Sequence, residues 1–168
     1  MDYTNLSRTD FDTVVTGELT HRILQLEESV NGIIGDFFIT EPSRREQFDQ
    51  LILFREGLTF QDKIGIVKAI VPFFQIEADK LNLTSLLKKV EDLKSYRNAM
   101  AHGRDVGGGD SPPTLKIGII SRSGKKKEIE ITSASHQKMM AEAKAVGKEL
   151  VKARAHLNEV FKSTSKKV

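Results

Sequence analysis

A long run of apolar residues spaced three or four apart is the feature of this sequence that most constrains its fold. The run is formed by Phe11, Val15, Leu19, Ile23, Leu26, Val30, Ile34 and Phe37. A 3.6-residue repeat brings these positions onto one face of an α-helix, so a long amphipathic helix is expected from Thr9 or Asp10 to a point before Pro42. Other helices must cover its apolar face, which favours a helical bundle.

Three glycines, at positions 17, 32 and 35, lie within this predicted helix. A glycine in a helix either weakens it locally or lets another helix approach closely. Both alternatives stay open for all three positions.

Two shorter helices are expected next. Pro42 suits a first helical position and begins a helix that stops near Gly57. Thr59 or Leu58 begins another, and Pro72 ends or bends it because proline lacks a backbone donor. Phe48, Leu51, Ile52 and Phe54 are the apolar residues of the first of these two helices.

The following helix is expected over Leu83–His102, after a helical connection at residues 73–83. Thr84 or Ser85 is its expected cap, and Gly103 closes it. Breakers from residue 103 to 113 then predict a loop.

A β-hairpin insertion is expected at about 114–132. Isoleucines alternate with polar residues over Leu115–Ser121 and Lys127–Thr132, and Ser123-Gly124 supplies the turn. Two short strands are therefore expected between helices.

The last helix is expected to be capped by Ser133 or Ser135 and to reach about Lys162. The polar tail 163–168 is expected to fray. Together these elements predict an all-α fold, a bundle of four to five helices with an inserted β-hairpin, formed by residues 1–168 as a single domain.

Composition excludes several classes of chemistry. The 168 residues include no Cys, so neither disulfides nor thiolate catalysis are available. The four His residues are scattered, so we expect no metal site and no cofactor. The net charge of +3 permits nucleic-acid binding without requiring it. The polar start of the chain and the lack of a long apolar segment predict a soluble, cytoplasmic protein without a membrane span.

An arginine interrupts the apolar stripe of the helix at Leu83–His102. The stripe consists of Leu86, Leu87, Val90, Leu93, Met100 and Ala101, and Arg97 falls inside it. A buried guanidinium needs an anion or a set of acceptors. Asn98 and His102 lie four apart and share a flank of the same helix. A cation, an amide and an imidazole at one helix end can hold a phosphate and move a proton.

The segment 94–103, Lys-Ser-Tyr-Arg-Asn-Ala-Met-Ala-His-Gly, resembles the signature of the HEPN superfamily, in which an arginine and a polar residue precede a histidine on a late helix of a bundle. The helix start at Leu58–Ile64 also resembles bacterial members, and the similarity covers mainly residues 51–103. The resemblance implies a HEPN-like fold. Many members are metal-independent endoribonucleases that act as toxins, in toxin–antitoxin systems, or as defence effectors.

If the resemblance extends to activity, Arg97 binds the scissile phosphate and His102 is the general acid or base. Asn98 orients the histidine or contacts the phosphate. The expected products carry a 2′,3′-cyclic phosphate, and a homodimer is expected because two family motifs usually line one cleft. RNA-binding candidates are Tyr96, Lys116, Arg122, Lys125, Lys126 and Lys127.

Structural interpretations stand beside each functional one. Arg97 can form an ion pair with Glu18 or Glu27, and the helix dipole alone favours a histidine at position 102. Tyr96 can pack, and the lysine run can simply be solvated. The alternative function is a non-catalytic HEPN module, as an antitoxin-like or regulatory subunit with a partner protein. A DNA-binding regulator is a third, less supported hypothesis.

Overall fold

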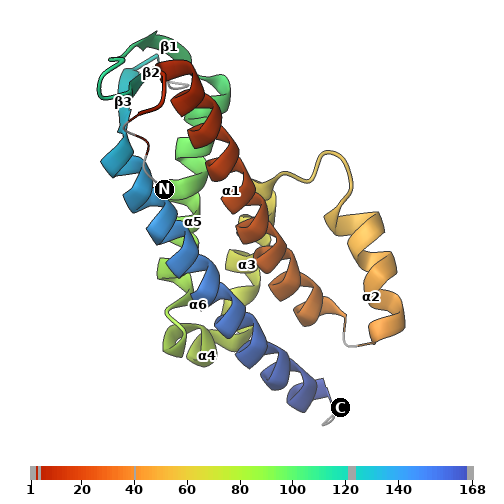
Figure 1. The fold of residues 1–168 in the computed structure, drawn as a ribbon. Coiled ribbons are helices and arrows are strands. Elements are labelled where there is room, and N and C mark those ends of the chain that lie inside the picture. Colours follow the sequence, from red (N-terminus) through yellow and green to blue (C-terminus); the bar gives the residue numbers. More distant parts are fainter. Residues whose placement is uncertain (1–2, 4, 40, 121–123, 166–168) are drawn as a thin grey trace. The chain divides into compact units, whose positions relative to one another are not determined.

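The protein, described here by a computed structural model, is mainly helical, with a three-stranded antiparallel sheet inserted before the last helix (Figure 1). The structure describes residues 3, 5–39, 41–120 and 124–165. The α-helices are α1 (Arg8–Phe38), α2 (Pro42–Phe48), α3 (Phe60–Ile70), α4 (Gln75–Lys80), α5 (Leu83–His102) and α6 (Ser133–Ser165). A π-helix, η1 (Asp49–Leu53), follows α2, and a 3₁₀ turn, η2 (Val71–Phe74), follows α3. The strands are β1 (Arg104–Gly107), β2 (Thr114–Ile120) and β3 (Lys126–Thr132).

The chain forms two compact units. Unit 1 comprises Met1–Ile23 and Asp92–Lys144, and unit 2 comprises Leu24–Glu91 and Ala145–Val168. The helices α1, α5 and α6 contribute residues to both units. Formation of a single domain over 1–168 stays a prediction.

The predicted long first helix is confirmed. The apolar residues Phe11, Val15 and Leu19 are buried in unit 1, and Leu26 and Val30 are buried in unit 2. The 3.6-residue repeat therefore identified the buried face of α1.

Hydrogen bonds at two helix starts and the bounds of a third helix correct three of the predicted caps. Ser7, rather than Thr9 or Asp10, caps α1, because its Oγ accepts from the Asp10 N–H at 3.1 Å. Thr132, rather than a serine, caps α6. At α5 the expected caps Thr84 and Ser85 lie inside the first turn, since the helix begins at Leu83. Thr59 caps α3 with a capping box, as one of the two alternatives predicted.

The second predicted helix changes its winding, which alters the face that it buries. Beyond α2 the chain continues as η1, where the Phe54 N–H donates to the Asp49 carbonyl five residues back. Leu53 is buried, whereas Leu51, Ile52 and Phe54 are exposed. Leu51, Ile52 and Phe54, named above as apolar residues of this helix, therefore do not form a buried face.

The sheet belongs to unit 1 and contains one strand more than predicted. β2 pairs antiparallel with β3 from Thr114↔Thr132 to Ile120↔Lys126, close to the predicted hairpin. The segment predicted as a loop at 103–113 is in part a strand, because β1 pairs with β2. Ser121 and Ser123, in the expected strand end and turn, lie outside the described residues.

α6 extends to Ser165, beyond the start of the expected frayed tail.

Gly103 ends α5 and lets it approach the sheet. Its N–H donates to the Ala99 carbonyl at 2.7 Å. A Cβ built on Gly103 would overlap Cγ2 of Ile117 in β2. The glycine therefore serves close packing between the end of α5 and β2, and its φ is not positive.

Candidate functional site

The candidate site lies in the last two turns of α5, within unit 1. The helix spans Leu83–His102, as predicted. Arg97 and Asn98 are half-buried, His102 is exposed, and Tyr96 is 38% exposed. Beyond Leu93 the predicted apolar stripe is only partly buried, because Ala101 is exposed and Met100 is half-buried. The motif therefore lies where the packed face of α5 reaches the surface.

Arg97 is not neutralised by either expected carboxylate. Its Nη1 donates to Oδ1 of Asn98 at 3.2 Å. The carboxylate of Glu18 accepts from other side chains, and Glu27 pairs with Lys63 at 2.5 Å in unit 2. Among the described residues Arg97 forms no ion pair, so its charge is held beside a neutral amide.

Helix geometry separates the guanidinium from the imidazole. Residues follow at about 100°, so Asn98 and His102 share a flank while Arg97 lies roughly 140° around the axis from His102. The rise along the helix between Arg97 and His102 is about 7.5 Å. Asn98 lies between them and touches Arg97 directly. One copy of the helix thus presents a guanidinium and an imidazole on different flanks.

The basic residues expected to guide RNA are dispersed. Lys116 is half-buried on β2, Lys126 and Lys127 are exposed on β3, and Lys125 is exposed directly before β3. Arg122 lies outside the described residues. Their contact with RNA stays a prediction.

The consecutive lysines Lys126 and Lys127 of β3 do not form one basic face. Successive side chains of a strand alternate, so Lys126 and Lys127 lie on opposite faces of the sheet. Lys127 shares its face with the buried Ile129, whereas Lys126 shares its face with the exposed Glu130. Lys116 is the direct cross-strand neighbour of Glu130. Acidic side chains therefore offset part of the positive charge on that face.

A second polar cluster in unit 1 escaped the sequence interpretation. Oε2 of Glu18 on α1 accepts from the Tyr3 hydroxyl at 2.8 Å and lies 2.7 Å from Nε2 of His136 on α6. Tyr3 is 4% exposed and His136 is completely buried, and their rings meet edge to face at 5.3 Å. The available signal was His136 itself, a polar residue one turn before Met139 on the apolar face of α6.

Burial and hydrogen bonding set the ionisation of this cluster. Burial raises the pKa of Glu18, but hydrogen bonds from His136 and Tyr3 outweigh it and leave the pKa below the usual 4.5. Burial, together with the hydrogen bond to Glu18 and its charge, raises the pKa of Tyr3 to about 12. Glu18 is therefore a carboxylate at neutral pH.

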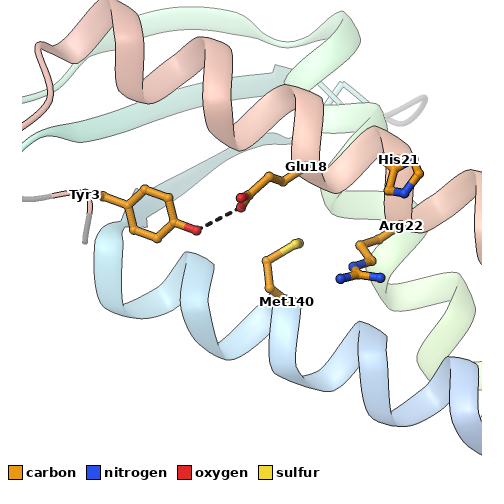
Figure 2. A pocket seen from close by; sticks show the side chains of 5 residues that line it. All are labelled: Tyr3, Glu18, His21, Arg22 and Met140. Atoms are coloured by element: carbon orange, nitrogen blue, oxygen red, sulfur yellow. Dashed lines mark hydrogen bonds between the residues drawn. The ribbon is translucent and has the colours of Figure 1, made fainter. Parts of the chain in front are cut away.

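A pocket of about 330 Å³ adjoins this cluster. It is lined by Tyr3, Glu18, His21, Arg22 and Met140, which Figure 2 shows on the N-terminal segment, α1 and α6. His21 and Arg22 follow Glu18 by three and four residues, so the helix repeat places all three on neighbouring positions of α1.

Within the described ranges, no group of three or more His, Asp or Glu side chains is arranged to hold a metal ion. None of the helices in those ranges combines the length and the apolar character that crossing a membrane requires.

Comparisons of the chain with models of protein families, with characterised proteins and with solved structures found no match. The resemblance to the HEPN superfamily therefore stays a prediction that rests on the motif of α5 and its surroundings.

Proposed function

We propose that the protein is a metal-independent endoribonuclease of HEPN type that uses Arg97, Asn98 and His102. The observation that carries this proposal is the half-buried Arg97, whose partner is the neutral amide of Asn98 and which pairs with no carboxylate among the described residues. A guanidinium in that setting keeps its full charge for an anion, and its planar donors suit a phosphate.

The proposed reaction is transesterification within RNA. The ribose 2′-oxygen forms a bond to phosphorus, the bond from phosphorus to the 5′-oxygen breaks, and a 2′,3′-cyclic phosphate results. Arg97 binds the phosphate oxygens and stabilises their developing charge. His102 takes the 2′-hydroxyl proton or supplies one to the leaving oxygen, and its exposure leaves it accessible to RNA. Asn98 holds the guanidinium in place.

The flank separation of Arg97 and His102 favours a homodimer as the active form. Two copies of α5 related by a two-fold axis would place the guanidinium of one protomer and the imidazole of its partner around one phosphate. Tyr96 and the candidate lysines of the sheet would contact flanking nucleotides. Such an activity suits a toxin or a defence effector that acts on RNA in the cytoplasm.

The test is cleavage of fluorescent single-stranded RNA in EDTA by the purified protein. We expect products with 2′,3′-cyclic phosphate ends, and losses of at least about 100-fold in His102→Ala and Arg97→Ala. Arg55→Ala and His156→Ala, at exposed positions of unit 2, are the matched controls and should retain activity. RNA left intact by the wild type, or equal cleavage by His102→Ala, would contradict the proposal.

The alternative is a non-catalytic module that binds a protein partner, in the manner of an antitoxin or a regulatory subunit. Exposed large apolar residues of unit 2 favour it: Leu51 and Phe54 are 67% and 64% exposed, and Phe73 and Ile76 are 78% and 72% exposed. This function predicts no RNA turnover by the wild type and a loss of partner binding in Phe73→Ser.

A further inference from the structure

The Glu18 pocket lies in unit 1, and none of its lining residues belongs to α5. Two buried side chains hold the carboxylate of Glu18 in place. Oε2 of Glu18 accepts from the Tyr3 hydroxyl at 2.8 Å and contacts Nε2 of His136 at 2.7 Å. Both of these partners are buried, so they restrict the rotation of the Glu18 side chain.

Oε1 is the second acceptor oxygen of the Glu18 carboxylate. Among the described residues none donates a hydrogen bond to Oε1, and the Glu18 side chain is 35% exposed. A carboxylate oxygen accepts about two hydrogen bonds. A ligand that presents N–H groups toward Oε1 thus meets a preorganised acceptor, since Tyr3 and His136 already occupy Oε2.

The rest of the lining adds positive charge and an adaptable apolar surface. Arg22 is half-buried and His21 exposed, both on α1. Met140 extends from α6 toward α1 (Figure 2). Guanidinium and imidazole groups bind carbonyl oxygens or a phosphate, and a thioether packs against planar rings. The volume of about 330 Å³ is within the range of small-ligand pockets.

We propose that the Glu18 pocket binds a guanine base, with the N1–H and N2–H groups of the base donating to Glu18 and its carbonyl or phosphate side facing Arg22 and His21. Guanine carries adjacent donors on one edge and acceptors on the other, which matches a carboxylate next to a guanidinium and an imidazole. The base comes either from RNA or from a free guanine nucleotide. The RNA source rests on the proposed ribonuclease function, whereas binding of the free base does not.

The test is calorimetric titration of the full chain with guanosine and GMP, compared with inosine, AMP, CMP and UMP. We expect saturable binding of guanosine and GMP, weaker binding of inosine because it lacks the N2 amino group, and weaker binding of the other nucleotides. Glu18→Gln should weaken guanosine binding by at least about tenfold, because a charge-assisted hydrogen bond is lost. The matched control Glu142→Gln, at an exposed position of α6, should bind like the wild type.

Glu18→Gln also disturbs Tyr3 and His136, so Met140→Trp provides a second test. The larger ring should fill the pocket and abolish binding, while circular dichroism and the melting temperature report an intact fold. Absence of saturable guanosine binding by the wild type, equal binding of all four nucleotides, or undiminished binding by Met140→Trp would overturn the proposal.

An oligouridine with one central guanosine distinguishes the two sources. Competition by this RNA against guanosine identifies RNA as the ligand, and binding of GMP alone identifies a free nucleotide. The titrations are repeated with His102→Ala, which should bind guanosine normally. Failure of guanine binding is thereby separated from failure of RNA cleavage.

Discussion

Replacing Gly35 by alanine should destabilise the protein, whereas the same change at Gly17 on the same helix should stabilise it. A Cβ on Gly35 would overlap the guanidinium of Arg45, while a Cβ on Gly17 meets nothing within 4 Å. That guanidinium binds Asp36, which is 7% exposed, and its Nε donates to Asp49 at 2.8 Å. Alanine at position 35 therefore requires the Arg45 side chain to shift, and this shift is costly because the guanidinium is bound to two carboxylates.

The magnitude follows from two opposing contributions. Loss of the charge-assisted bonds of Arg45 costs about 1.5–3 kcal/mol of the free energy of unfolding, and among the described residues Arg154 is then the cationic partner that Asp36 keeps. Alanine in place of glycine within a helix raises the free energy of unfolding by about 0.5–1 kcal/mol. The free energy of unfolding should fall by about 1–2 kcal/mol in Gly35→Ala and rise by about 0.5–1 kcal/mol in Gly17→Ala.

Urea unfolding followed by circular dichroism at pH 7 measures both changes. In an Arg45→Ala background the steric conflict is absent, so Gly35→Ala should become stabilising by about 0.5–1 kcal/mol. A stabilising effect of Gly35→Ala in the wild-type background, or the same destabilisation with and without Arg45, would refute the role assigned to this glycine.

Three further predictions concern the packing and ionisation of single residues. Gly103→Ala should lower the free energy of unfolding by about 1–3 kcal/mol through overlap with Ile117, measured by urea unfolding, and an unchanged midpoint would contradict the close approach of α5 to β2. In Tyr96→Phe the remaining Tyr3 should ionise with a pKa of about 12, read from tyrosinate absorbance, and a midpoint near the usual 10 would contradict both its burial and its bond to Glu18. Burial raises the pKa of Asp36, but bonds from two arginines outweigh burial and leave the pKa below 3.8. Ionised Asp36 therefore stabilises the fold above pH 3.8. This contribution to the free energy of unfolding is lost as the pH falls through the lower pKa of Asp36 in the folded state. The stability difference between the wild type and Asp36→Asn should accordingly shrink below pH 3.8, and a constant difference would argue against this linkage.

Local patterns predicted α1, α5, β2 and β3 well, because side-chain periodicity depends on the backbone repeat alone. β1 escaped prediction because Arg104–Gly107 carries no alternation of its own and becomes a strand by pairing with β2. The exposure of Leu51 and Phe54 could not be predicted either. The π-type winding depends on the hydrogen bond between the Phe54 N–H and the Asp49 carbonyl, and no residue type indicates such a bond.

The same difference between local and distant contacts decides which site residues the sequence could identify. Arg97, Asn98 and His102 were found because they are neighbours on one helix, and the helical repeat relates their flanks. The cluster of Tyr3, Glu18 and His136 joins residues up to 133 positions apart. Such a contact forms only when folding brings these distant segments of the chain together.

The amino-acid sequence alone determined which segments are helical, which face of α1 is apolar, and that one helix ends in an arginine, an amide and an imidazole. Only the tertiary structure decided that Arg97 faces Asn98 instead of a carboxylate, that Gly35 makes room for Arg45, and that Glu18 is held by two buried partners. Periodicity acts between near neighbours, whereas the partner of a charged group depends on which distant side chain the packed core brings within hydrogen-bonding distance.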